Sequence, residues 1–202
     1  MQPMDIERRS MEIIESELQR ELPADIKPIV KRVIHASADF SYADTLHFTP
    51  GVVEYARKLM QRGASVITDT NMALAGINKS AAGKLGLRLD CFMAVKSVAL
   101  EAAERGVTRA TVCMERALAL DGPRIMVCGN APTFLMPLLD APPKSDVVVI
   151  GVPVGFVNVC EAKQRLWESG VPCITALGRR GGSNIAAAIV NALMYGIEGV
   201  RT

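Results

Sequence analysis

The chain has 202 residues, of which 50% are hydrophobic and 22% are charged, so it can bury one sizeable core and is not a disordered chain. Its 23 basic and 21 acidic residues give a formal net charge of +2, and only 4% of the residues are aromatic. This balance argues against a general binder of nucleic acids or of membrane surfaces.

The sequence predicts no membrane-spanning segment. Its longest uncharged run, residues 181–197, opens with Gly-Gly-Ser-Asn and is shorter than the roughly 20 apolar residues that a transmembrane helix needs. The first 22 residues are charged throughout and hold no apolar signal-peptide core. We therefore expect a soluble, cytoplasmic protein with no membrane partner.

The first 62 residues are predicted to be mainly helical. Apolar residues at helical spacing predict an amphipathic helix over 5–21 and a second helix over 25–36. Thr49 as N-cap and Pro50 in the first turn predict a third helix, which ends near Arg62. The segment between the second and third helices shows no sustained period.

Beyond residue 63, short apolar segments alternate with helical ones. We predict strands at 64–69, 90–95, 124–129, 146–151 and 172–177, and helices at about 70–86, 97–105, 108–120, 131–139, 158–169 and 183–196. The alternation predicts one α/β domain over residues 1–202, a three-layer α/β/α fold with a mostly parallel sheet of about five strands. The N-terminal helical segment would be an appendage or a dimer arm.

Three consecutive predicted strands end in glycine-containing turns that open helices, namely CGNAPT (128–133), GVPVGF (151–156) and GRRGGS (178–183). Because glycine permits close approach and helix N-termini offer free N–H groups, these turns predict a cleft for an anionic ligand. Asn130 and Ser183 are also plausible helix caps, and Arg179 and Arg180 add positive charge. Taken singly, each turn fits an ordinary strand–helix connection better than a ligand site; the three together on one predicted edge favour the cleft. The turns supply the candidate ligand-binding residues Gly129, Asn130, Thr133, Gly155, Arg179, Gly182 and Ser183.

His35 is the candidate acid–base residue. It lies near the end of the second predicted helix, where an imidazole can exchange a proton near neutral pH; the alternative is a structural histidine. His47, between Leu46 and Phe48, is expected to be a packing or turn residue. Neither histidine has a cysteine nearby, and the five cysteines show no C-x-x-C spacing. We therefore expect no metal site and no disulfide framework.

Polar residues also follow the first predicted strand. Asp69, Thr70 and Asn71 stand at its carboxyl end, where site residues gather, although Asp69 or Thr70 could equally cap the next helix. Arg109 opens another predicted helix. It could clamp a carboxylate with two hydrogen bonds, or only be a solvated surface residue.

Several nucleotide and hydrolase motifs are missing from the sequence. There is no G-x-x-x-x-G-K-[ST], no G-x-G-x-x-G after the first predicted strand, and no G-x-S-x-G. The sequence therefore supports neither a nucleotide triphosphatase nor a standard dinucleotide enzyme, and it argues against a serine hydrolase.

Taken together, several strings resemble the precorrin-8X methylmutase family: RVIHASADF, TDTNMALAGI, TRA at 108–110, GNAPT, IGVPVGF, and GRRGGS followed by AAAIVNAL. They occur in that family's order, and the resemblance covers the chain from Ser10 to about Leu193. The DTNM form is more similar to the branch that acts on cobalt-precorrin-8 than to the cobalt-free branch.

The resemblance implies an isomerase of corrin biosynthesis that moves a methyl group from carbon 11 to carbon 12 of the macrocycle, giving cobyrinate or hydrogenobyrinate. It implies a homodimer with the site near the subunit interface, no cofactor, and a corrinoid substrate that carries any cobalt itself. The family's catalytic histidine matches His35, so the resemblance implies that His35 gives a proton to the macrocycle. A substrate-contacting arginine matches Arg109, and a serine on the first helix matches Ser10.

Two other classes remain open from the sequence. The first is a non-catalytic tetrapyrrole-binding or carrier protein on the same scaffold, whose ligand binding would survive loss of His35. The second is an unrelated α/β enzyme that acts on a small phosphorylated substrate, for which simple phosphates would compete at the glycine turns.

Overall fold

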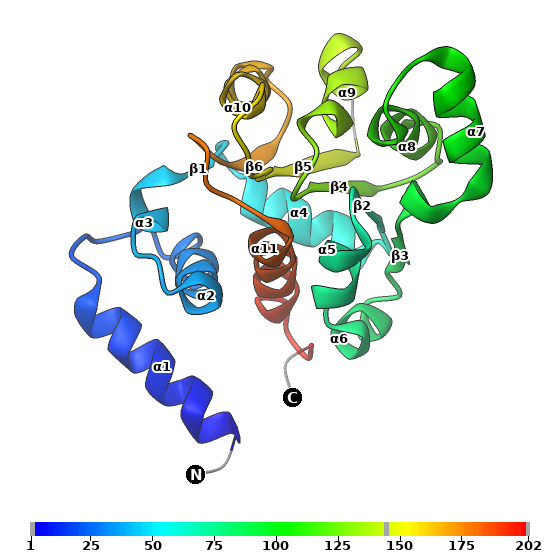
Figure 1. Cartoon of the computed structure of the whole chain (residues 1–202). Helices are drawn as coiled ribbons and strands as arrows, with labels where there is room; N and C mark the ends of the chain where they lie inside the picture. The colour runs from blue at the N-terminus through cyan, green and yellow to red at the C-terminus, as the bar shows by residue number, and fades with distance from the viewer. Residues whose placement is uncertain (1–2, 144–145, 201–202) are drawn as a thin grey trace.

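The computed structural model describes residues 3–143 and 146–200, and its centre is a six-stranded sheet (Figure 1). The strands are β1 (Leu46–Phe48), β2 (Ser65–Thr68), β3 (Arg88–Asp90), β4 (Arg124–Cys128), β5 (Val147–Gly151) and β6 (Cys173–Ala176). Their order in the sheet is β1-β6-β5-β4-β2-β3. Strands β2 to β6 pair in parallel, whereas β1 pairs with β6 in the antiparallel sense.

Helices cover both faces of the sheet, so the three-layer α/β/α prediction is confirmed. One face carries α2 (Lys27–Ser37), α4 (Val52–Gln61), α5 (Asn71–Gly76), α6 (Lys79–Lys84) and α11 (Ser183–Tyr195). The other face carries α7 (Lys96–Arg105), α8 (Arg109–Leu118), α9 (Met136–Asp140) and α10 (Val159–Glu168). Short elements complete the chain: α3 (Tyr42–Thr45) and the 3₁₀ turns η1 (Phe92–Ala94) and η2 (Pro132–Phe134).

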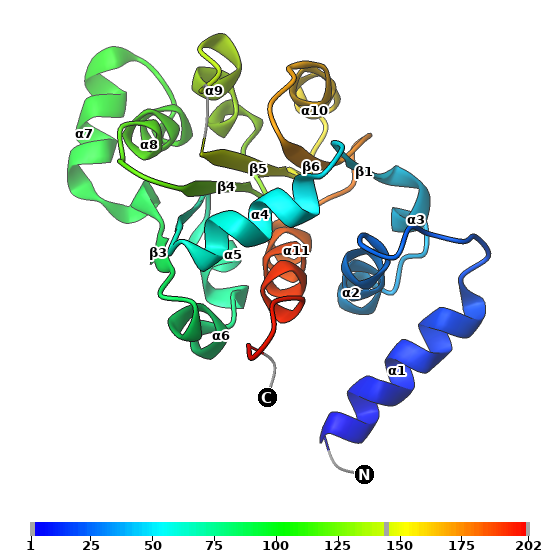
Figure 2. The ribbon, with the colours of Figure 1, turned by 180° about the vertical axis from the view of Figure 1, so that it is seen from behind.

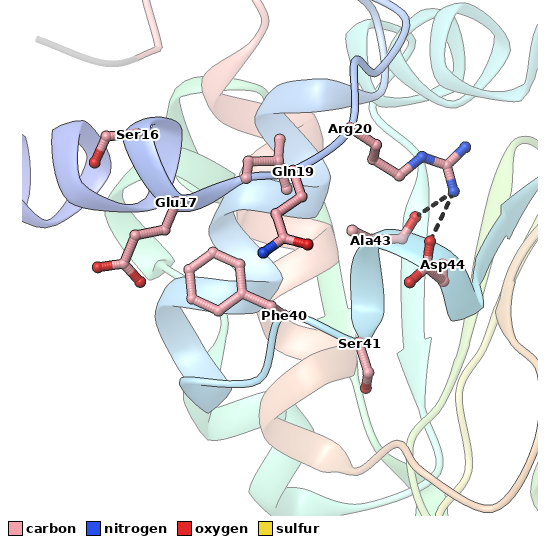
Figure 3. Close-up of a pocket in the computed structure, with 9 residues that line it drawn as sticks. Ser16, Glu17, Gln19, Arg20, Phe40, Ser41, Ala43 and Asp44 are labelled. Atoms are coloured by element: carbon pink, nitrogen blue, oxygen red, sulfur yellow. Dashed lines mark hydrogen bonds and ion pairs between the residues drawn. The ribbon is translucent and has the colours of Figure 1, made fainter.

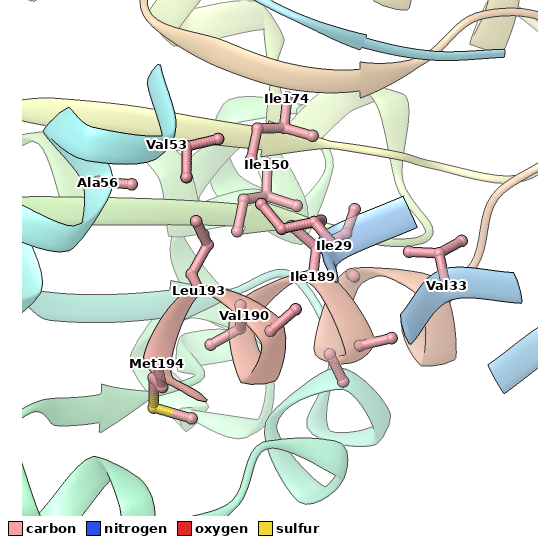
Figure 4. Close-up of a cluster of buried hydrophobic side chains, with 14 of the residues drawn as sticks. Ile29, Val33, Val53, Ala56, Ile150, Ile174, Ile189, Val190, Leu193 and Met194 are labelled. Atoms are coloured by element: carbon pink, nitrogen blue, oxygen red, sulfur yellow. The ribbon is translucent and has the colours of Figure 1, made fainter. Parts of the chain in front are cut away.

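Two hydrophobic clusters hold these layers together, one on each side of the sheet. Every residue of β5 is buried, and alternate side chains serve opposite faces, with Val148 and Ile150 on the α11 side and Val147 and Val149 on the α10 side. This explains why that strand is apolar at consecutive positions. Figure 4 shows the larger cluster, in which side chains of α11 pack between the sheet and α2.

Helix α1 (Pro3–Glu17) projects from the body of the molecule, beside α2 (Figures 1 and 2). Ion pairs to α2 help to hold it, since Glu7 pairs with Arg32 at 2.6 Å and Glu15 with Lys31 at 2.7 Å. Ile14 is buried, but Ile6 is 53% exposed. Part of the apolar face of α1 therefore stays in contact with solvent.

The structure corrects several predicted boundaries. Helix α1 ends at Glu17 rather than near residue 21, and the predicted strand at 90–95 is the short β3 followed by η1. The predicted helix at 70–86 is two helices, α5 and α6, and the one at 131–139 is η2 followed by α9. The sixth strand, β1, lies in the segment where the sequence shows no period.

Thr49 is not a helix cap. Its hydroxyl donates to the carbonyl of Cys173 at 3.2 Å and accepts from the Cys173 N–H at 2.9 Å, so it extends the contact between β1 and β6. Helix α4 instead starts after Gly51, which has a φ of +71°. Within the described residues, no helix has the length and apolar character required to cross a membrane.

Candidate active site

The sheet reverses its strand order between β2 and β4, and Asp69 lies at that point. Strand β3 lies on one side of β2, and β4, β5 and β6 follow on the other side. In open parallel sheets, ligands bind outside the carboxyl ends of the strands at such a switch. Asp69 directly follows β2, and Gly129 directly follows β4, so the two residues face this position from neighbouring strands.

The Asp69 carboxylate holds the turn that follows β4. It accepts the backbone N–H groups of Gly129 at 2.9 Å, Asn130 at 2.7 Å and Ala131 at 2.8 Å. Asp69 is fully buried. Burial raises the pKa of its carboxyl above the usual value, although the three N–H donors oppose this shift. Because this side chain has no exposed surface, its geometry fits a residue that shapes the turn rather than one that contacts a ligand.

Thr70 and Ser183 connect this turn to the start of α11. Their hydroxyl oxygens lie 2.8 Å apart, and Thr70 also caps α5 by accepting the Ala73 N–H at 3.1 Å. Gly129 lies so close to Ser183 that a Cβ on it would be 2.8 Å from the Ser183 Cα. Of the two residues that could cap this helix, Asp69 and Thr70, the structure shows Thr70 as the cap.

Ser183 and Asn130, by contrast, cap no helix. The N-cap of α11 is Gly182, and the N-cap of η2 is Ala131. Asn130 and Asn71 are exposed at the carboxyl edge of the sheet, where their side chains are accessible to a ligand.

The turns after β5 and β6 are joined to each other. The Gly182 N–H donates to the Val152 carbonyl at 2.9 Å, and the Gly155 N–H donates to the Arg179 carbonyl at 3.2 Å. The Arg179 guanidinium lies over the ring of Phe156, 5.5 Å from its centre. Phe156 is 84% exposed. This part of the edge therefore presents an aromatic ring and a cation side by side.

Arg180 connects the same turn to the segment after α2. Its Nη1 donates to Oδ2 of Asp39 and to Oγ of Ser41, both at 2.5 Å. The hydrogen bonds from Ser41, followed by the charge of Arg180, hold the pKa of Asp39 below its usual range. His35 lies in the last turn of α2, one turn before Asp39, and its side chain is exposed. The contact thus attaches the His35 end of α2 to the carboxyl edge of the sheet.

A cavity of about 730 Å³ lies beside this segment, between α1 and α3 (Figure 3). Ser41 borders both the cavity and the contact with Arg180. Phe40 and Gln19 line it, and Arg20 closes one side by donating to Asp44 at 3.0 Å. The cavity is therefore continuous with the segment that follows His35.

Arg109 and Thr133 lie on neighbouring elements. Thr108, the N-cap of α8, donates to the Thr133 hydroxyl at 3.0 Å. Arg109 is exposed, and its Nη1 contacts the Met93 carbonyl at 3.4 Å. Ser10 is the exception among the predicted residues, because it lies on α1, where its hydroxyl donates to the Ile6 carbonyl at 2.9 Å.

The sequence does not predict that Asp39 and Ser41 belong to the site. Both lie in the stretch without a period, and their importance comes from Arg180, which is 141 and 139 residues away in sequence. Local sequence carries no signal for such a contact.

The edge as a whole suits an anionic ligand with an apolar surface. Carboxylates are attracted by the exposed guanidinium groups of Arg109 and Arg179. They are also attracted by the N-termini of α8 and α11. Exposed Val154, Phe156 and Val157 offer apolar contact. Within residues 3–143 and 146–200, no group of three or more His, Cys, Asp or Glu side chains could hold a metal ion.

Comparisons with known proteins identify relatives of the chain in sequence and in fold. The family model described as precorrin-8X methylmutase matches residues 5–196. A cobalt-precorrin-8 methylmutase from Salmonella typhimurium is 41% identical over 96% of this chain and 95% of that protein. A precorrin-8X methylmutase from Pseudomonas aeruginosa is 38% identical over 85% of each chain. The crystal structure of a precorrin-8X methylmutase from Thermus thermophilus superposes with a TM-score of 0.85, at 36% identity, over 94% of this chain and 96% of that one.

Proposed function

Because this chain belongs to the precorrin-8X methylmutase family of isomerases in cobalamin biosynthesis, we propose that it moves a methyl group from carbon 11 to carbon 12 of a corrin precursor. Its natural substrate in this proposal is cobalt-precorrin-8, which would be converted to cobyrinate. The support for the cobalt form is that the Salmonella typhimurium and Priestia megaterium relatives, at 41% and 36% identity, both carry the name cobalt-precorrin-8 methylmutase. Precorrin-8X, which would give hydrogenobyrinate, is the second candidate substrate.

His35 is the proposed proton donor. Protonation of the macrocycle interrupts the conjugation that opposes migration of the methyl group, so the reaction needs one acid and a firmly oriented ring. Substrate and product are isomers, so a proton gained at one position of the ring must be matched by loss of a proton elsewhere in the same turnover. The observation that supports His35 is its exposed imidazole at the end of α2, beside the segment that Arg180 fastens to the carboxyl edge of the sheet.

The carboxyl edge is the proposed substrate surface. The macrocycle carries many carboxylates, for which Arg109, Arg179, Asn71 and Asn130 are exposed partners. Thr70, Thr133, Gly155 and Ser183 are proposed to line the surface, while Asp69, Gly129 and Gly182 are proposed to shape it. No cofactor is proposed, because an isomerisation needs no redox partner and no energy donor.

We propose that the protein works as a homodimer in the cytoplasm. The exposed Ile6 and Ile13 on the projecting helix α1 are apolar surface that a second copy could cover. Ser10 lies on the same helix, where its hydroxyl donates to the Ile6 carbonyl, and its proposed contact with substrate is made in a site shared between two copies. Sedimentation equilibrium tests this: a dimer that Ile6→Glu dissociates supports the arrangement, and a monomeric wild type contradicts it.

The test of the proposed reaction is conversion of cobalt-precorrin-8 and precorrin-8X, followed by the visible spectrum of the macrocycle. Wild type is expected to convert both, the cobalt form faster, while His35→Ala keeps binding and loses conversion. His47→Gln is the matched control, because His47 is the other histidine and its ring packs against Trp167, with 5.3 Å between the two ring centroids. Equal turnover by His35→Ala would remove His35 as the acid. Binding without conversion by wild type would contradict the isomerase and favour a carrier.

A further inference from the structure

Lys163 is a fully buried lysine on α10, with an exposed fraction of 0%. Lysine is rarely buried to this extent unless it has strong partners, because taking an ammonium group out of water is costly. Burial accordingly lowers its pKa to about 8. Instead of a carboxylate, the Lys163 Nζ contacts two backbone carbonyl oxygens.

These two carbonyls belong to the turn that follows β6. Nζ donates to the Gly178 carbonyl at 2.9 Å and to the Arg180 carbonyl at 2.6 Å. The carbonyl between them, that of Arg179, accepts the Gly155 N–H at 3.2 Å. Three successive carbonyls of the turn are therefore bound from the side of α10 and the loop that precedes it. That fixes the backbone of the turn.

The direction of the Arg180 side chain depends on that backbone. With its carbonyl held by Lys163, Arg180 extends away from α10 to Asp39 and Ser41. Those residues follow His35 directly after the end of α2. A chain of contacts thus runs from the buried amine to the segment beside the proposed proton donor.

We propose that Lys163 is a positioning residue for the methyl shift, because it holds the 178–182 turn in the conformation in which Arg180 fastens the His35 end of α2. The inference rests on the proposed function. Lys163 does not touch the substrate, since its side chain has no exposed surface. If Lys163 only filled the core, its loss would lower stability and leave the turnover of the folded protein unchanged.

The first test is turnover of cobalt-precorrin-8 by Lys163→Met, whose side chain has a similar length but no donor. Measured where circular dichroism shows the variant to be folded, its kcat is expected to fall on the order of 10- to 100-fold, as a small misplacement of reacting groups produces. Gln164→Met is the matched control: Gln164 is the next residue of α10, is exposed and bonds Glu168 of the same helix. Its kcat is expected to stay within about twofold of wild type. Unchanged kcat in folded Lys163→Met would overturn the proposal.

A double-mutant cycle tests the route. If Lys163 acts through Arg180, then Lys163→Met lowers kcat much less in an Arg180→Ala background than in wild type. Fully additive losses would show that the two residues act independently, and would overturn the proposal. Lys163→Gln, which keeps an N–H donor on a shorter side chain, replaces Lys163→Met if that variant does not fold.

Hydrogen–deuterium exchange gives a readout that does not depend on activity. In the Lys163 variants, exchange is expected to accelerate in residues 178–183 and also in 39–41, where the Ser41 N–H bonds Asp39. If exchange is unchanged in both segments, the proposal is overturned, whether or not wild type converts a corrinoid. Failure of wild type to convert either substrate, with exchange changed as expected, would contradict the proposed function and leave the positional link supported.

Discussion

Arg180 donates to the Asp39 carboxylate at 2.5 Å and thereby joins the turn after β6 to the segment after α2, across 141 residues of sequence. The Arg180 side chain is 61% exposed, and exposed ion pairs contribute about 0–1 kcal/mol to stability. The contact therefore matters more for where it places the His35 end of α2 than for the stability of the fold.

We therefore predict that Arg180→Ala changes the turnover of the protein much more than its stability. We expect its free energy of unfolding to fall by at most about 1 kcal/mol, while kcat with cobalt-precorrin-8 falls on the order of tenfold or more because the segment that follows His35 loses its contact with the edge of the sheet. Arg62→Ala is the control, since Arg62 is 54% exposed and pairs with Asp146 elsewhere on the surface at 2.7 Å. If both variants lose similar stability but only Arg180→Ala loses turnover, the positioning role of Arg180 is supported. Equal turnover in both variants would refute that role.

Replacing Asp69, in contrast to Arg180, is expected to lower the stability of the fold strongly. Replacing it with asparagine exchanges an acceptor oxygen for an N–H donor against backbone N–H groups in a buried site, which leaves donors facing donors. We expect Asp69→Asn to lower the free energy of unfolding by roughly 2–4 kcal/mol, measured by urea denaturation. Asp140→Asn is the control, because Asp140 is 68% exposed and pairs with Arg165 at the surface. A loss below 1 kcal/mol for Asp69→Asn would show that the turn does not depend on this carboxylate.

Gly181 marks a close approach between two turns. A Cβ at this position would overlap the carbonyl oxygen of Val152, a backbone atom that cannot move aside without shifting the end of β5. We expect Gly181→Ala to lower the thermal midpoint by several degrees and to reduce turnover, since the same shift displaces the turn that carries Arg180. Gly83→Ala provides the comparison, because Gly83 lies in α6, where the added Cβ meets nothing within 4 Å apart from the adjacent backbone of its own helix. That variant is expected to match or exceed wild-type stability. A thermal midpoint for Gly181→Ala equal to that of wild type would contradict the close approach.

The sequence predicts β2, β4, β5 and β6 well because each is a short, largely buried run between helices. It misplaces β3, an edge strand whose first and last residues, Arg88 and Asp90, are charged and exposed. Strand β1 escapes prediction because it has three residues, two of them half-buried, at the edge of the sheet. The position of Asp69 is predictable from its place after β2, but its partners belong to a turn that follows β4, 60 to 62 residues later. The same holds for Asp39 and Lys163, which become informative only once the fold brings the 178–182 turn to them.

The buried amine of Lys163 also predicts a pH dependence of stability. Its pKa in the folded protein is about 8, below the value of about 10.4 expected in the unfolded chain. Between these values the unfolded chain binds more protons than the folded one, so stability conferred by Lys163 rises with pH from about 8 upward and is constant below. The neutral amine still has two N–H groups for the two carbonyls, so the turn keeps its hydrogen bonds.

The measurement is the free energy of unfolding of wild type minus that of Lys163→Met, taken by urea denaturation at pH 7 and pH 10. Taking the difference cancels groups that titrate equally in both proteins. We expect it to shift in favour of wild type by on the order of 2 kcal/mol between the two pH values. A difference that is constant with pH would show that the amine titrates alike in the folded and unfolded states. A shift in favour of the variant would mean that the two carbonyls stabilise the ammonium form by more than burial destabilises it.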